Sequence, residues 1–136
     1  TLRSAFGDVS NWENSSIRND LSENILPSLP DNVRNIIVPV KKYTKCVDGE
    51  IMTIDSLWIP SCREVSGDKD KETQGTVYSE RFYDNNSRAK QTMANGSWWL
   101  RSGKFNMHFY SVNKAGSVSD STMHHNSYGI VFGFCT

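Results

Sequence analysis

Apolar residues near the start of the chain recur with the period of a helix. Ile17, Leu21 and Ile25 are four residues apart, so they would share one face of a helix. One of the serines at 15–16 would cap the first turn, and Pro27 would end the helix. The pattern therefore predicts one amphipathic helix.

The residues around Pro39 predict a short helical turn followed by a hairpin. Pro30 suits the first position of a helix and Pro39 forces the chain out of one, so we expect a turn over residues 30–37. Its inward-facing residues would be Val33, Ile36 and Ile37. After Pro39 the apolar period changes to two, and Asp48-Gly49 is a typical turn dipeptide. Residues 40–54 therefore predict a β-hairpin.

The later apolar runs are rich in β-branched and aromatic residues, which favours strands. Strands are expected at 57–59, 98–101 and 105–112, with a turn at Gly116, and a buried strand is expected at 129–135. Early helices and late strands around one core predict an α+β domain with mainly antiparallel strands. The expected aromatic core residues are Trp58, Trp98, Trp99, Phe132 and Phe134.

Residues 63–76 are charged and almost free of apolar side chains, so they predict an exposed, solvated loop. The start of a calcium-binding loop is suggested by Asp68, Asp70 and Glu72. However, Thr73 stands where such a loop needs Gly, and Ser79 stands where it needs a bidentate Glu. The solvated loop is therefore the stronger interpretation.

The bulk composition excludes some classes of partner. The 136 residues carry 15 basic and 15 acidic side chains, so no net charge attracts nucleic acid or an anionic membrane. No apolar run reaches the roughly 18 to 20 residues that cross a bilayer. Residues 1–10 do not resemble a signal peptide, and a start at Thr1 leaves the full-length parent open. The odd set Cys46, Cys62 and Cys135 argues against a disulfide framework and favours buried free thiols.

The ionisable residues do not form a recognisable catalytic or metal motif. The adjacent His124 and His125 would point to opposite faces of a strand, which does not suit one metal ion. A cage that joins them to Cys46 and Cys62 lacks the short ligand spacings of zinc sites. We therefore expect no catalytic residue, no metal and no cofactor. The alternative enzyme hypothesis is a metal-dependent hydrolase that uses His108, Asp120, His124 and His125.

The stretch between Ser102 and Gly129 differs from the rest of the chain in composition. It holds all three histidines, and its small polar residues and tyrosines resemble those of an antibody paratope. The candidate ligand-binding residues are Asn106, His108, Tyr110, Ser111, Asn113, Ser119, Asp120, Ser121, Thr122, His124, His125, Asn126, Ser127 and Tyr128. A solvated surface hairpin would have the same composition. The rigid apolar runs on either side favour a presented binding surface.

Those flanking runs carry a family resemblance. They read WWLRS at 98–102 and GIVFGFC at 129–135. Together with 29–33, 55–59 and 86–90, they resemble a domain common in gut bacteria and their phages. Some members of that group are similar to the variable proteins of diversity-generating retroelements, which have a C-type lectin-like fold. The resemblance covers the chain from about residue 14 to its end.

The resemblance implies one C-type lectin-like domain over 1–136, with a constant scaffold at 1–102 and 129–136 and a variable surface at about 103–128. In that family a reverse transcriptase miscopies template adenines, so that AAC codons become any NNC codon. NNC codons encode every candidate residue named above. They do not encode the residues expected to be constant, which are Lys104, Met107, Lys114 and Met123.

The function implied is a ligand- or receptor-binding module rather than an enzyme. It would recognise a protein or glycan receptor on a cell surface, from a phage tail or a bacterial surface. Its anchors would be His108, Tyr110, His124, His125 and Tyr128. Display in several copies would raise avidity. No contact with nucleic acid and no membrane insertion are expected.

Two related activities are not implied. The Glu-Pro-Asn, Gln-Pro-Asp and Trp-Asn-Asp motifs of calcium-dependent sugar-binding lectins are absent from this sequence. The active-site cysteines of the related formylglycine-generating enzymes do not match Cys46, Cys62 or Cys135. The alternative to a diversified receptor-binding module is a surface or adhesion module of the same fold with a constant sequence.

Overall fold

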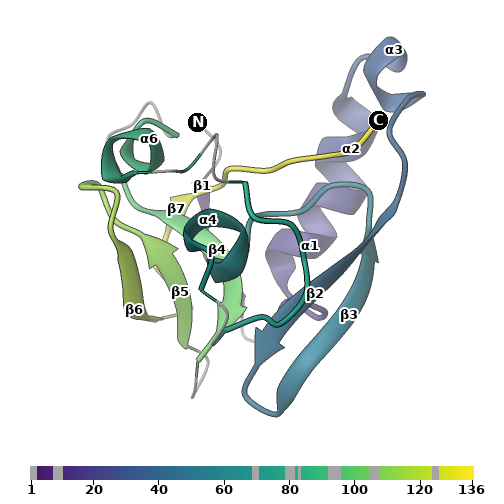
Figure 1. The fold of residues 1–136 in the computed structure, drawn as a ribbon. Helices are drawn as coiled ribbons and strands as arrows, with labels where there is room; N and C mark the ends of the chain where they lie inside the picture. The colour runs from purple at the N-terminus through teal and green to yellow at the C-terminus, as the bar shows by residue number, and fades with distance from the viewer. Residues whose placement is uncertain are drawn as a thin grey trace.

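The structure is a computed structural model of residues 1–136 and describes 3–7, 11–68, 71–78, 82, 84–91, 96–104, 108–123 and 126–136. For residues 120–123 it describes the backbone alone. The protein is α+β, with few helices and mostly antiparallel strands (Figure 1).

Three consecutive segments form the predicted N-terminal helix: α1 (Ser16–Asp20), η1 (Leu21–Ile25) and α2 (Leu26–Ser28). Ser15 caps it by accepting a hydrogen bond from the Arg18 N–H at 3.1 Å. The prediction that Pro27 ends the helix is wrong, because the helix continues to Ser28. The π-helical segment η1 lies just before Pro27, whose missing N–H removes one bond of a regular α-helix.

The second helical turn, α3 (Asp31–Arg34), follows Pro30 as predicted. The prediction that Ile36 faces inward is wrong, because its side chain is 55% exposed. The helix ends at Arg34, so Ile36 no longer follows the helical period. Ile37 packs against the core.

The predicted hairpin consists of β2 (Val40–Cys46) and β3 (Gly49–Asp55), paired from Val40↔Asp55 to Cys46↔Gly49. Its loop is Val47-Asp48, one residue earlier than predicted, and Gly49 follows with φ 129°. The inner face of β2 is polar, since Lys42 and Thr44 are buried.

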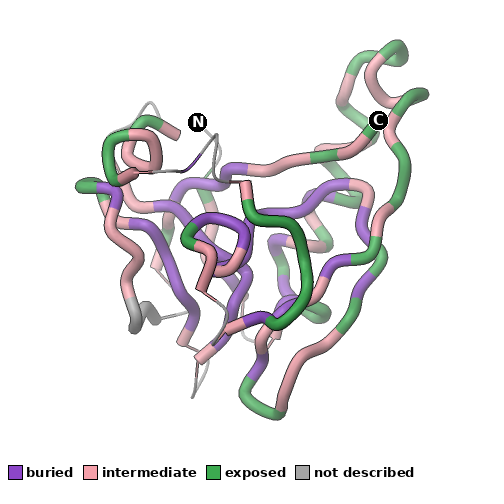
Figure 2. The backbone as a smooth tube through the Cα atoms, viewed as in Figure 1, coloured by how far each residue is buried: buried purple, intermediate pink, exposed green. Residues whose placement is uncertain are grey.

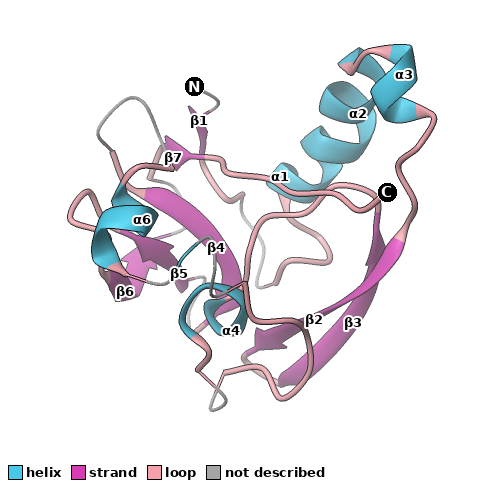
Figure 3. Cartoon of the chain, turned by 45° about the horizontal axis from the view of Figure 1, so that its top comes forward, coloured by secondary structure: helices cyan, strands magenta, loops and turns pink. Residues whose placement is uncertain are grey.

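The larger sheet has the strand order β1-β7-β4-β5-β6. Its strands are β1 (Arg3–Ser4), β4 (Trp98–Gly103), β5 (His108–Val112), β6 (Val118–Met123) and β7 (Tyr128–Gly129). The β4–β7 pair is parallel and the other pairs are antiparallel. Figure 3 shows this sheet and the β2–β3 hairpin as separate parts of the molecule.

Two short helices lie in the part of the chain that connects β3 to β4. The helix α6 (Asn85–Ala89) is capped by Asp84, and α4 (Cys62–Ser66) by a capping box between Ser61 and Glu64. The prediction of an exposed loop over 63–76 is therefore wrong in part. Its first residues are helical, and Glu64, Val65 and Glu72 are buried.

The core lies on both faces of β4, all six residues of which are buried (Figure 2). Trp99 and Phe109 belong to one cluster, and Trp98 and Leu100 belong to the other. The predicted core residues Trp58, Trp98 and Trp99 are confirmed, whereas Phe132 is partly buried and Phe134 is 40% exposed. Among the described residues, five aromatic core residues were not predicted from the sequence, which are Phe6, Trp12, Phe82, Phe109 and Tyr110.

The predicted strands at 57–59 and 129–135 are reduced to isolated bridges. Trp58 pairs with Gly133, and Val38 pairs with Cys135. Ile130 and Val131 are buried as predicted, but Phe134 is not. The C-terminal segment, yellow in Figure 1, is therefore buried only at its start, and its residues after Val131 are half-buried or exposed.

Candidate functional site

A pocket of about 450 Å³ opens beside the C-terminal segment. Three separate stretches of the chain form it, and most of its walls are aromatic. Its lining residues are Trp58, Pro60, Val77, Tyr78, Phe82, Val131, Phe132, Gly133, Phe134 and Cys135. We call this set the aromatic pocket. Its volume lies in the range of about 300–1,000 Å³ that ligand sites usually have.

The bridge between Trp58 and Gly133 positions two walls of the aromatic pocket. The Trp58 N–H donates to the Gly133 carbonyl at 3.2 Å, and the Gly133 N–H donates back at 2.8 Å. A Cβ atom at Gly133 would lie 3.6 Å from the Trp58 ring. A side chain at this position would therefore begin against the indole, at the wall of the pocket.

Lys42 holds two aromatic rings of the pocket from behind. Its ammonium lies 3.9 Å from the centroid of the Trp58 ring and donates to the Tyr78 hydroxyl at 3.0 Å. It also forms an ion pair with Glu64 at 2.8 Å. Because the Lys42 side chain is 7% exposed, these contacts are shielded from water and restrain both rings.

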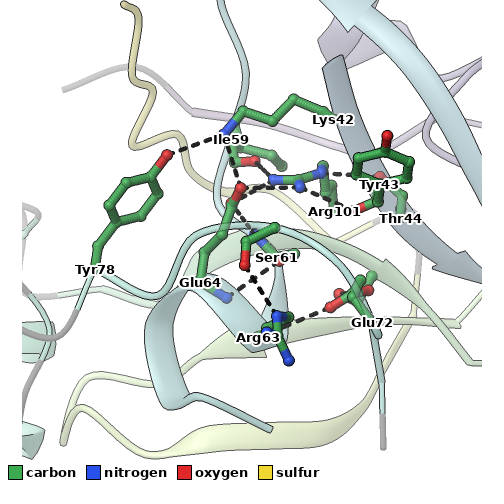
Figure 4. Close-up of polar contacts among 12 residues, drawn as sticks. Lys42, Tyr43, Thr44, Ile59, Ser61, Arg63, Glu64, Glu72, Tyr78 and Arg101 are labelled. Atoms are coloured by element: carbon green, nitrogen blue, oxygen red, sulfur yellow. Dashed lines mark hydrogen bonds and ion pairs between the residues drawn. The ribbon is translucent and has the colours of Figure 1, made fainter. Parts of the chain in front are cut away.

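Glu64 is the centre of a buried ion cluster, shown in Figure 4. Arg101 donates to both of its carboxylate oxygens, at 2.6 and 3.1 Å. The remaining guanidinium bonds of Arg101 go to the Thr44 hydroxyl and to the carbonyls of Tyr43 and Ile59. We call Lys42, Glu64 and Arg101 the ion cluster. It joins β2, α4 and β4 behind the aromatic pocket.

The ion cluster sets the charge state of Glu64. Burial opposes ionisation, but the Arg101 guanidinium and the Lys42 ammonium outweigh it and lower the pKa of Glu64 below its ordinary value of 4.5. Glu64 is therefore an ionised structural carboxylate at neutral pH. A general acid would need a raised pKa instead.

The lowered pKa predicts acid lability. A carboxyl whose pKa is lower in the folded state stabilises the protein above its unfolded pKa, and this stabilisation is lost as the pH falls through the folded value. We expect the free energy of unfolding to fall below pH 4.5, with Glu64 contributing at most about 1.4 kcal/mol per pH unit. Urea titrations between pH 3 and 7 measure this slope. A Glu64→Gln variant with the same slope as the parent would contradict the assignment.

Glu72 is another buried carboxylate, with 0% of its surface exposed. It accepts hydrogen bonds from the backbone N–H of Lys45 at 2.7 Å and of Arg63 at 3.2 Å, and from the Ser102 hydroxyl at 2.7 Å. The suggestion of a calcium loop required a Glu72 that is open to an ion. In the structure its oxygens are instead occupied by protein donors. Asp70 and Ser79, two further positions of that motif, lie outside the described residues.

Two of the predicted ligand-binding residues of β5 are not open to a partner. Tyr110 is 5% exposed and Ser111 is 2% exposed. The expectation that they lie on an open surface is wrong, because β5 is an inner strand between β4 and β6 and is covered on both faces. Tyr110 packs in the cluster of Trp98 and Leu100.

Several other predicted residues have structural contacts. The Asn113 side chain accepts from the backbone N–H groups of Ala115 and Ser117, both at 3.0 Å, and so holds the β5–β6 turn. Tyr128 packs on Trp99 with ring centroids 4.8 Å apart, and Asn126 donates to its hydroxyl at 3.4 Å. These contacts explain the residues without a ligand.

The remaining candidates divide between partly accessible positions and positions that are not described. His108, Ser119 and Asn126 are half-buried, and Ser127 is exposed. Strand β4 separates β7, with Asn126 and Ser127 beside it, from β5 and β6. The described candidates therefore lie in two separate regions, one at β7 and the other along β5, β6 and their turn. The candidates whose side chains lie outside the described residues are Asn106, Asp120, Ser121, Thr122, His124 and His125.

The three cysteines are free. Cys46 and Cys62 are buried as predicted, and burial is the main cause that raises the pKa of Cys46 to about 11 and that of Cys62 to about 12. Cys135 differs because it is half-buried and lines the aromatic pocket. Within the described residues, no three His, Cys, Asp or Glu side chains gather as a metal site. The predicted alternatives of a metal cage and a hydrolase centre depend on His124 and His125, which are not described.

The cysteines predict a selective alkylation pattern. Iodoacetamide at pH 8 should label Cys135 in the folded protein and leave Cys46 and Cys62 unmodified, because buried thiols with a raised pKa form little thiolate. Mass spectrometry of tryptic peptides measures the labelling. The same reaction in urea should label all three cysteines. Rapid labelling of Cys62 without urea would contradict its burial.

Comparison with known proteins gives one match. Residues 3–135 match the family described as "Domain of unknown function (DUF6273)". No curated protein and no solved structure matches the chain. Across the part of the chain that the structure describes, no helix has the length and apolar character needed to cross a bilayer. Because the match spans almost the whole sequence, the protein belongs to the DUF6273 family.

Proposed function

We propose that the protein is a non-catalytic ligand-binding module and that the aromatic pocket is its binding site. The observation that carries this proposal is a preformed apolar cavity whose rings are restrained by the ion cluster behind them. A restrained pocket binds with a smaller loss of side-chain entropy than a mobile one. None of the three carboxylates that are buried among the described residues, Asp55, Glu64 and Glu72, is available as a catalytic base, since each is already paired with protein donors.

We further propose that the scaffold is C-type lectin-like. The arrangement of early helices and mainly antiparallel strands is consistent with that fold class. The two motifs of the family resemblance also meet in space, because Trp98 of β4 pairs with Gly129 of β7. The motif at 98–102 forms most of the buried strand β4, and the motif at 129–135 continues to the rim of the aromatic pocket.

The biological setting follows from the same resemblance. The module would recognise a receptor on a cell surface, from a phage tail or a bacterial surface, and would act in several copies. Multivalent display converts a modest affinity per site into strong attachment. A pocket of this size, bordered by an extended chain segment, suits such a modest individual contact.

A fragment titration tests the binding site. We expect indole and benzene derivatives to shift the amide resonances of Tyr78, Gly133 and Phe134 in ¹H–¹⁵N NMR spectra, because these residues line the aromatic pocket. The Gly133→Val variant should lose at least about 90% of this affinity, equivalent to about 1.4 kcal/mol, because its side chain would occupy the pocket beside Trp58.

The matched control is Ile54→Ala, which removes an apolar side chain that is 59% exposed outside the pocket. This variant should bind the fragments as the parent does. Fragment shifts scattered over the surface, or equal binding by Gly133→Val, would show that the aromatic pocket is not the site.

The diversified surface is a second candidate, supported by the position of β6. This strand forms the edge of the five-stranded sheet and carries Ser119, Asp120, Ser121 and Thr122. An edge strand tolerates substitution better than a central one. Sequencing the DNA beside the gene tests the idea. A near-duplicate of the 3′ end with AAC codons, together with a reverse transcriptase gene, would support it, and the absence of both would remove it.

A further inference from the structure

The C-terminal segment has one edge that is paired with the protein and another that is not paired with any described residue. The Val38 N–H donates to the Cys135 carbonyl at 3.0 Å, and Gly133 exchanges two bonds with Trp58. Along an extended chain, alternate residues direct their N–H and C=O groups to the same side. Phe132 and Phe134 therefore direct theirs to the opposite side. Among the described residues, none forms a backbone hydrogen bond with Phe132 or Phe134.

This free edge borders the aromatic pocket. Phe132 and Phe134 both line the pocket, and Phe134 and Val77 are each 40% exposed at it. Proteins usually protect a free edge with charged side chains or proline. Residues 130–136 contain neither. An unprotected, apolar edge beside a cavity is typical of a segment to which a strand of another chain can pair.

We propose that the aromatic pocket binds an extended peptide whose backbone pairs with Phe132 and Phe134 and whose apolar side chains enter the pocket. This inference rests on the pocket being the binding site. In such strand addition, backbone hydrogen bonds supply affinity, and pockets for alternate side chains supply specificity. Pairing with both phenylalanines requires at least three peptide residues, which span about 7 Å at roughly 3.3 Å per residue.

The lining of the pocket favours a peptide over a glycan. A sugar is usually held by side-chain carboxylates and amides that bond its hydroxyls, and none of the described lining residues carries either group. The Tyr78 hydroxyl already accepts a bond from Lys42. Among the described residues, the polar groups at the rim include the N–H and C=O groups of Phe132 and Phe134, and their alternation matches the backbone of a peptide.

A random 12-residue peptide display library, selected on the full 136-residue chain, tests the proposal from the ligand side. The enriched peptides should share apolar or aromatic residues at positions i and i+2. For synthetic copies, N-methylation of an amide that pairs with the edge should weaken binding at least about tenfold, measured by calorimetry. N-methylation of the neighbouring amides should change binding less than about threefold. Equal effects at all amides would overturn the pairing.

Substitution at Phe134 tests the same pairing from the protein side. Phe134→Ala removes the ring and keeps the N–H group, whereas Phe134→Pro removes both. Peptide binding by the proline variant should be at least about tenfold weaker than by the alanine variant. Thermal unfolding shows whether both variants are folded. If the proline variant is not folded, the N-methylated peptides alone test the proposed pairing.

The outcomes separate this inference from the proposed function. If fragments bind the aromatic pocket and no peptide is enriched over the Gly133→Val variant, the pocket is a binding site and the peptide inference is wrong. Binding of a glycan array at the pocket, without peptide binding, would overturn the inference in the same way. If neither fragments nor peptides bind, both proposals fail.

Discussion

Replacing Glu64 by Gln should lower the free energy of unfolding by about 3–5 kcal/mol. The substitution preserves the shape of the side chain and removes its charge. Arg101 and Lys42, whose side chains are 1% and 7% exposed, would then be buried cations without a counter-ion. Desolvation of these charges makes the loss large. Urea denaturation monitored by tryptophan fluorescence measures it.

The matched control is Asp31→Asn, which removes the carboxylate of an ion pair with Arg34. The Asp31 side chain is 81% exposed, so water screens the pair, and we expect a loss of less than about 1 kcal/mol. Similar losses for the two variants would mean that the ion cluster is hydrated in solution and does not restrain the pocket.

The second large effect is expected for Gly116→Ala, at about 2–6 kcal/mol. Gly116 has φ 87°, which a residue with a side chain rarely adopts. In addition, a Cβ atom there would overlap the Asn85 backbone, while the Gly116 carbonyl accepts from Arg88 at 2.7 Å. The estimate adds about 1–3 kcal/mol of backbone strain to a similar cost of overpacking. Denaturation curves of the variant and the parent give the difference.

Gly49→Ala separates these two causes. Gly49 also has a positive φ, of 129°, but no atom lies within 4 Å of the Cβ position. This variant should lose about 1–2 kcal/mol through strain alone. An equal loss in the two variants would mean that the contact between the β5–β6 turn and α6 can relax without cost.

The elements that could be predicted from the sequence are those whose cause is local. The period of Ile17, Leu21 and Ile25 and the cap at Ser15 are properties of adjacent turns, and the structure confirms that helix. The β2–β3 hairpin likewise needs only alternation and a turn dipeptide. Pro27 was misleading because a π-helical segment accommodates it, which no local pattern signals.

The stretch at 63–76 could not be predicted because its partners are distant in sequence. Glu64 is buried by Arg101, and Glu72 is buried by Ser102 and Lys45. A charged run without those partners would be solvated, as the composition indicates. The capping box at Ser61 and Glu64 was the local signal that could have revealed α4.

The candidate site was predicted only in part, for a similar reason. The residues of the polar segment were chosen by composition, and composition does not distinguish an inner strand from an edge. Tyr110 and Ser111 lie on the inner strand β5. The aromatic pocket combines residues from 58–60, 77–78 and 131–135 with Phe82, and no single segment carries its pattern. Phe134 was placed in the core because it is apolar, but its side chain borders the pocket instead.

The three bonds to Glu72 have a consequence for local motion. They connect the segment around Glu72 to β2 through Lys45, to α4 through Arg63 and to β4 through Ser102. This segment therefore does not open at low cost, since its release would leave buried donors on three elements without their acceptor. A stretch as hydrophilic as a linker is thereby incorporated into the cooperative unfolding unit of the domain.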